Sequence, residues 1–179
     1  MKMKHVTSLL LLTLMLVACN QPRPATATAT VTAPPTTDQC YYVWAYKDLP
    51  EASQQFQQML QKAIPEATSS VYEYGENCVY ADGHSTFGAM ETDINITIPV
   101  DDLKDDKATS LSLEKVLPIL AAFATDHQSA RIKQIEFRFH LKLKDESRYV
   151  RFQLQVGLDA IAKGLHGSAL LEALNANSP

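Results

Sequence analysis

The chain has 179 residues, of which 46% are hydrophobic and 20% are charged, and its formal net charge is −4 at pH 7. This composition is typical of a globular protein. The acidic balance argues against nucleic acid as a partner, because nucleic-acid binding depends on clustered lysine and arginine. Residues 39–179 are enough for one folded domain and leave no room for a second.

The N-terminal residues have the three-part order of an export signal. Lys2 and Lys4 carry positive charge, and a mainly apolar stretch follows over residues 9–17. This stretch is too short to cross a bilayer, which needs about 20 residues. It predicts that residues 1–18 form a signal peptide that is removed on export, which would leave a mature chain of net charge −6.

The end of this segment, Leu16-Val17-Ala18-Cys19, resembles the lipobox of bacterial lipoproteins. The resemblance implies a diacylglyceryl thioether on Cys19, cleavage before it and, in many bacteria, a further acyl chain such as palmitate on the new amino terminus. Two or three chains hold a protein firmly on a membrane, whereas one chain anchors it only marginally. Asn20 is not Asp, which implies export to the outer membrane or cell surface where the cell has two membranes.

A tether is predicted between Cys19 and the folded domain. Residues 20–38 contain four Pro, six Thr and four Ala, without Gly or an aromatic residue. Such a tract buries too little apolar surface to offset the entropy of ordering, and its prolines favour extended backbone. A tether of this length would hold the domain roughly 25–60 Å from its anchor.

The two remaining cysteines, Cys40 and Cys78, are predicted to form a disulfide, because disulfides persist in the oxidising compartment outside the cytoplasm. In the chain-entropy model such a bridge stabilises the fold by roughly 4 kcal/mol. The alternatives, a metal site or a reactive thiol, have no accompanying ligand spacing. We therefore predict neither a metal site nor a cofactor.

The first half of the domain begins with strand and helix signals. Residues 40–46 are rich in Tyr, Val and Trp and favour a strand. A helix is predicted next, with Asp48 as its N-cap, apolar residues on one face and Pro65 at its end. Residues 71–80 favour a second strand, which Gly75 interrupts.

The second half repeats this alternation of strand and helix. After a turn at Asp82-Gly83, a third strand is predicted in which residues 94–100 alternate between apolar and polar side chains. After an acidic loop at residues 101–107, a helix is predicted over residues 113–124. Two further alternating stretches, whose apolar sides end at Leu143 and Val156, predict an antiparallel hairpin with one wet, basic face.

A last helix over residues 158–174, broken near Gly164, completes the order βαββαββα. This order predicts an α+β fold with an antiparallel-rich sheet and helices on one face. The first six elements resemble the ferredoxin-like βαββαβ pattern. That pattern conflicts with the predicted disulfide, because its parallel first strands would keep Cys40 and Cys78 more than about 7 Å apart. Between the two, we favour the disulfide.

Aromatic residues supply the first candidate site. Six of the seven tyrosines lie with Trp44 in a span of about 40 residues. Because strand residues alternate between faces, Tyr42, Trp44 and Tyr46 share one face with Cys40. Exposed Tyr and Trp rings suit a sugar or peptide ligand, since they combine apolar area with a polar tip. The alternative is that these rings form the core and rim of the sheet.

Two carboxylates supply the second candidate site. Glu91 and Asp93 lie two residues apart in a strand, which places them about 7 Å apart on one face, as acid and base pairs sometimes need. The alternative is ordinary polarity on an exposed strand. With no catalytic motif present, the leading hypothesis is a non-enzymatic surface module that binds a glycan, a peptide or an envelope protein. The rival is an envelope hydrolase that acts on cell-wall or glycan substrate.

Overall fold

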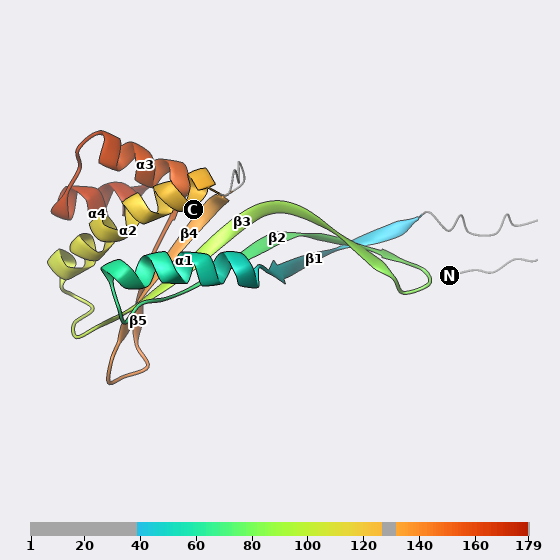
Figure 1. The fold of residues 1–179 in the computed structure, drawn as a ribbon, viewed down its shortest axis with the longest axis horizontal. Helices are drawn as coiled ribbons and strands as arrows, with labels where there is room; N and C mark the ends of the chain where they lie inside the picture. The colour runs from blue at the N-terminus through green and yellow to red at the C-terminus, as the bar shows by residue number, and fades with distance from the viewer. Residues whose placement is uncertain (1–38, 127–131, 179) are drawn as a thin grey trace, which may run out of the picture. The chain divides into compact units, whose positions relative to one another are not determined.

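The elements follow the predicted order in a computed structural model that describes residues 39–126 and 132–178 (Figure 1). In chain order they are β1 (Cys40–Asp48), α1 (Pro50–Ala63), β2 (Thr68–Tyr80), β3 (Ser85–Val100), α2 (Asp106–Asp126), β4 (Ile132–Leu141), β5 (Ser147–Gln153), α3 (Leu154–Ala162) and α4 (Gly167–Ala176). The α+β fold is confirmed, and the last predicted helix is divided in two. The predicted signal peptide, Cys19 and the tether lie outside the described residues.

The five strands form one sheet in the order β1-β2-β3-β4-β5. β3 and β4, which α2 connects, pair in parallel. The other three pairs are antiparallel, in keeping with the predicted antiparallel-rich sheet and the predicted last hairpin. Because β1 and β2 are antiparallel neighbours, Cys78 lies opposite Tyr42, which is two residues from Cys40 on the same face of β1. The two cysteines are therefore close enough to form the bridge. The sheet therefore has the arrangement that the disulfide requires and not the ferredoxin-like one, in which the first two strands are parallel.

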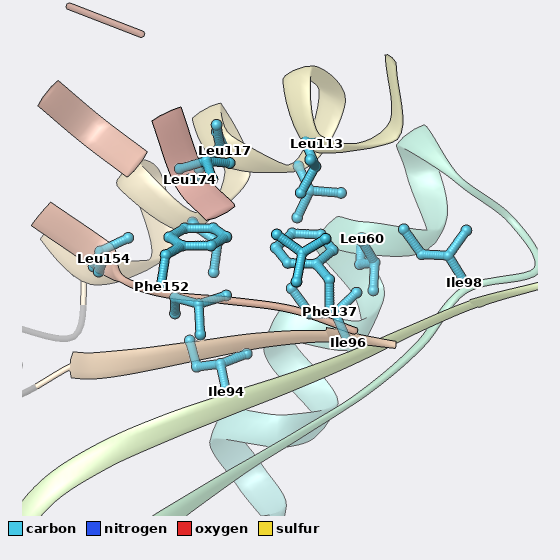
Figure 2. Close-up of a cluster of buried hydrophobic side chains, with 14 of the residues drawn as sticks. Leu60, Ile94, Ile96, Ile98, Leu113, Leu117, Phe137, Phe152, Leu154 and Leu174 are labelled. Atoms are coloured by element: carbon cyan, nitrogen blue, oxygen red, sulfur yellow. The ribbon is translucent and has the colours of Figure 1, made fainter. Parts of the chain in front are cut away.

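One face of the sheet is packed against the helices. Val71, Ile94, Ile135 and Phe152 lie in one row across β2 to β5, and all four are buried. Alternate residues continue this apolar face along three of the strands, namely Ile96 and Ile98 on β3, Phe137 and Phe139 on β4 and Val150 on β5. Each helix contributes to the same core, and Figure 2 shows Leu60, Leu113, Leu117, Leu154 and Leu174 meeting the strand side chains. The prediction of helices on one face is thus confirmed.

Helix α1 is fixed to β2 by polar side chains as well as apolar ones. β1 pairs only with residues 72–80 of β2, so β2 extends past the end of β1. There Ser53 Oγ accepts from the Val71 backbone N–H at 2.8 Å and donates to the Val71 carbonyl at 3.1 Å. Gln57 Oε1 accepts from the Ser69 backbone N–H, and Gln57 Nε2 donates to the Ala67 carbonyl. Side chains of α1 therefore satisfy backbone groups that β1 does not reach.

Helix α2 is the longest helix in the part of the chain that the structure describes, and Pro118 lies inside it. By length and composition alone it could cross a membrane. Its Leu113, Leu117, Leu120 and Phe123 are buried in the core, however. The packing of α2 on the sheet accounts for its apolar composition.

The far halves of β2 and β3, together with β1, project beyond the helices as a three-stranded arm (Figure 1). We call residues 40–48, 74–80 and 85–91 the arm, and the helix-covered remainder the body. A bulge at Tyr74 and Gly75 marks the boundary between them. A Cβ on Gly75 would lie 2.1 Å from the Gly88 carbonyl oxygen, so only glycine allows the two strands to approach this closely.

Three predicted boundaries are wrong. Asp48 ends β1 and does not cap α1, which starts at Pro50, a residue suited to the first turn of a helix. Leu143 does not face inward but is 96% exposed in the turn after β4. The last strand ends at Gln153, and the residues after it, including Val156, form α3. Over three or four residues, an apolar and polar alternation does not distinguish a strand from the first turn of a helix.

Candidate functional site

The sheet face opposite the helices, which we call the open face, holds the candidate residues. On this face Tyr46 of β1 lies beside Tyr74 of β2, which lies beside Glu91 of β3. The next row places Tyr72 beside Asp93. The aromatic residues and the carboxylates, which sequence analysis treated as two separate candidates, therefore lie next to each other.

Four aromatic rings on the open face contact one another. Trp44 stacks on Tyr74 with ring centroids 5.2 Å apart and an interplanar angle of 11°. Tyr46 lies 5.0 Å from Tyr74 and meets Tyr72 edge to face at 5.5 Å. Such pairs contribute about 0.5–1.5 kcal/mol beyond burial. We call Trp44, Tyr46, Tyr72 and Tyr74, together with Tyr42, which lies farther along the same face of β1, the aromatic cluster.

The predicted members of this cluster are not core residues. Tyr42 is 68% exposed, Trp44 59% and Tyr46 69%, which excludes the alternative that they fill the core. Sequence analysis did not include Tyr72 and Tyr74 as partners, although both lie in the tyrosine-rich stretch that predicted β2. Knowing that β1 and β2 are antiparallel neighbours would have identified them.

The Cys40–Cys78 disulfide is present and lies at the far end of the arm. Its Cα atoms are 5.3 Å apart, within the range that a bridge needs. Cys78 lies directly opposite Tyr42. The bridge therefore joins β1 to β2 beside the aromatic cluster and restrains the edge strand that carries three of its rings.

A hollow of about 380 Å³ lies on the open face where the arm meets the body. All five strands contribute to it, and its lining residues are Tyr46, Tyr72, Asp93, Asn95, Gln134, Glu136 and Arg151. A larger recess of about 560 Å³, between β1 and α1, is lined by a single continuous segment, residues 47–55. The hollow is the better candidate, because it brings together aromatic, carboxylate, amide and guanidinium groups from distant parts of the chain.

Asp93 is the most perturbed group in this hollow. Asp93 is only 9% exposed, and its Oδ1 has no hydrogen-bond partner among the residues that the structure describes. Burial, and then the negative charge of Glu91, raise the pKa of Asp93 to about 6. A hydrogen bond from the backbone of Gln134 and the charge of Lys133 act in the opposite direction. Asp93 is therefore ionised at pH 7 at a cost in free energy.

The neighbouring carboxylates have cationic partners. Glu91 pairs with Lys133 at 2.9 Å, and Glu136 accepts from Arg151 Nε at 2.5 Å. The guanidinium of Arg151 also lies 5.2 Å from the centroid of the Tyr149 ring. Burial, and then Asp93, raise the pKa of Tyr72, so this phenol stays neutral at pH 7. Among the described residues, Asp93 thus differs from Glu91 and Glu136 in having no cationic side chain paired with it.

Within residues 39–126 and 132–178, no group of three or more His, Cys, Asp or Glu side chains is arranged to hold a metal ion. No protein-family model, curated protein or solved structure matches the chain. The function is therefore argued from the open face itself.

Proposed function

We propose that this chain is a lipid-anchored protein of the bacterial cell envelope and that the aromatic cluster on its open face binds an envelope ligand. The lipobox-like end of the N-terminal segment and the Pro- and Thr-rich tract after Cys19 support the anchor and the tether. A disulfide between Cys40 and Cys78 fits an extracytoplasmic location. We place the domain on the outer membrane or cell surface where the cell has two membranes.

The exposed aromatic cluster is the observation that carries the binding proposal. Tyr42, Trp44 and Tyr46 are each more than half exposed, although burying such rings is strongly favourable. Contiguous exposed apolar surface of this kind marks interaction sites in soluble domains. The stacked rings give a ridge against which the flat face of a sugar ring, or an apolar segment of peptide, can pack.

Trp44 makes this proposal directly measurable, because it is the only tryptophan in the chain. Its fluorescence should change when soluble cell-wall glycan fragments or peptides are added to the full-length protein in detergent. Tyr42→Ala and Tyr46→Ala should each weaken binding about tenfold or more, because such rings act as binding hot spots. Tyr41→Ala is the matched control, since this 63% exposed tyrosine of β1 lies on the opposite face.

Equal losses for Tyr41→Ala and Tyr42→Ala would contradict a site on the open face. A glycan array and a peptide panel that give no ligand, together with cleavage of cell-wall polymer by the same protein, would contradict a binding module.

The anchor has its own test. Cys19→Ala should abolish the acyl mass on the N-terminal peptide and shift the protein from the membrane fraction to the soluble fraction. Mass spectrometry and detergent partitioning measure these two effects. A wild-type N-terminal peptide without acyl mass would overturn the lipoprotein proposal.

A carboxylate-dependent hydrolase is the second candidate, and the environment of Asp93 favours it. A carboxyl group whose pKa is raised to about 6, on the same strand face as the carboxylate of Glu91, has the properties of a general acid beside a base or nucleophile. The Glu91–Lys133 ion pair would first have to open or move. Release of reducing ends from cell-wall glycan, lost in both Glu91→Gln and Asp93→Asn, would favour this activity over binding alone.

A further inference from the structure

We propose that the hollow at the base of the arm accepts a protonated amine of the bound ligand, held by Asp93 and by the rings of Tyr46 and Tyr72. This inference rests on the proposed binding function and names the group that the ligand must carry.

The charge of the hollow favours a cation. Glu136 is neutralised by Arg151, and Glu91 at its margin is neutralised by Lys133. Among the described residues no cationic side chain pairs with Asp93, and Lys133, whose charge acts on it, is already paired with Glu91. The described groups around the hollow therefore carry one more negative charge than positive charges. A buried carboxylate in this state is strongly attracted to a cation that can reach it.

The hydrogen bonds of Asp93 point to a donor. Its Oδ1 has no partner among the described residues, although 91% of the residue is buried. Oδ1 is itself closed off from solvent, so a ligand donor reaches it only when the carboxylate turns part of the way about its terminal torsion, which is broad in aspartate. An ammonium group has three donors and no acceptor, and it would give Asp93 a charge-assisted hydrogen bond of about 2.7–2.9 Å.

The walls of the hollow fit the same group. Tyr46 and Tyr72 meet at an interplanar angle of 63°, so their rings form a corner beside Asp93. A cation over such rings gains about 0.5–2 kcal/mol. The side chains of Asn95 and Gln134 also line the hollow, and they can accept from the remaining N–H groups or bond to neighbouring hydroxyls. A neutral hydroxyl could bond to Asp93 but would leave its charge uncompensated.

The amine can come from two sources, an amino sugar or a lysine-type side chain, and matched probes separate them. The first pair is a glucosamine trimer and its fully N-acetylated counterpart. The second pair is Nα-acetyl-lysine methylamide and the same molecule acetylated at Nε. In each pair acetylation removes the positive charge and leaves the rest of the skeleton in place. Isothermal titration of full-length protein in detergent should detect the free amine of at least one pair, bound at least tenfold more tightly than its acetylated form.

Variants then assign this preference to Asp93. Asp93→Asn should lose the tenfold preference, because the amide carries no charge. Asp145→Asn makes the same chemical change in the exposed turn after β4, and this variant should keep the tenfold preference for the free amine. Unaltered amine preference in Asp93→Asn would overturn the inference.

The pH dependence gives an independent readout. Between pH 7 and 5 the lysine probe stays protonated, while Asp93, whose pKa is about 6, takes up its proton. The neighbouring charges come from Glu91 and Lys133 at the margin and from Glu136 and Arg151 in the wall. Burial and Asp93 raise the pKa of Tyr72 above its ordinary value, so this phenol adds no charge in this range. The ring of Tyr46 completes the lining on this side. Affinity for the amine should therefore fall roughly tenfold from pH 7 to pH 5 in the wild type, and not in Asp93→Asn.

The failures of the two proposals are distinguishable. Equal binding of free and acetylated probes, with sensitivity to Tyr46→Ala, would overturn the amine inference and leave the aromatic binding site in place. No binding of either free amine at millimolar concentration would also overturn the amine inference, while the Trp44 titrations with glycans and peptides decide the proposed function separately.

Discussion

Strands β2 and β3 pair with each other in both the body and the arm, but their side chains meet different surroundings in the two regions. In the body their alternate residues, such as Val71 and Ile94, are buried beneath the helices. In the arm, β2 pairs with β1, and no helix covers the corresponding face. Tyr41 and Val43 of β1 lie on this face and are exposed. The comparison shows that strand pairing, ring stacking and a disulfide hold the arm together, whereas the helices supply the hydrophobic core of the body.

The candidate site lies where these two regions meet. Tyr46 belongs to the arm, and Arg151 and Gln134 belong to the body, yet all three line the hollow. The position of Tyr46 depends on the edge strand β1, which is held by β2, by ring stacking and by the disulfide. The following variants separate what stabilises each region, from the largest expected effect to the smallest.

Phe137→Ala should have the largest effect, because this ring is fully buried among strand and helix side chains in the body. The expected loss is about 3–5 kcal/mol of the free energy of unfolding. Trp44→Ala in the arm should cost under about 1 kcal/mol, since the ring is 59% exposed and loses mainly its stacking on Tyr74. Urea unfolding followed by circular dichroism measures both. Similar losses would remove the energetic distinction between body and arm.

Replacing both Cys40 and Cys78 by Ser should lower the free energy of unfolding by about 2–5 kcal/mol, because the bridge closes a loop of 38 residues in the unfolded chain. Non-reducing peptide mapping of the wild type confirms the linkage beforehand. In the variant, amide hydrogen exchange should accelerate most in β1, which has only β2 as a strand neighbour. Uniform acceleration over β1 and β4 would mean that the bridge does not act locally on the arm.

Gly75→Ala should cost about 1–3 kcal/mol, because its Cβ would collide with the Gly88 carbonyl oxygen at the bulge. Gly88→Ala is the matched control in the facing strand. There the nearest atom to a new Cβ is 3.7 Å away, which is ordinary contact. Thermal unfolding of the two variants should therefore differ clearly, and equal stability would show that the strands separate at the bulge without cost.

Asp93→Asn should stabilise the protein by about 1–2 kcal/mol at pH 8, since it removes a buried charge. The folded pKa of Asp93, about 6, lies above its ordinary value of 3.8, so the folded state binds the proton more tightly than the unfolded state. The cost of the charge is complete above pH 6 and is lost as the pH falls toward 4. The advantage of the variant should disappear over that window. If Asp93→Asn remained more stable than the wild type by the same amount from pH 8 to pH 4, the stabilisation would come from packing and not from the loss of ionisation.

Local patterns in the sequence determined most of the elements. Alternation over residues 94–100 and in the last hairpin predicted β3, β4 and most of β5, because a half-buried strand needs an apolar residue at every second position. The count and setting of Cys40 and Cys78 predicted their pairing, which the structure confirms. The same alternation placed Tyr42, Trp44 and Tyr46 on one face, and Glu91 and Asp93 on one face, since these relations depend only on the backbone of a single strand.

Only the tertiary structure decided how these faces meet. No local pattern encodes that β1 pairs antiparallel with β2, which places Tyr72 and Tyr74 among the predicted rings and Asp93 beside them. The hollow needs one residue or more from each of five strands, and those strands span more than a hundred residues of the chain. Asp93 is costly to ionise because it is buried and because the described cations Lys133 and Arg151 pair with Glu91 and Glu136 instead. These are properties of the packed sheet, because desolvation and ion pairing depend on neighbours that are distant in sequence.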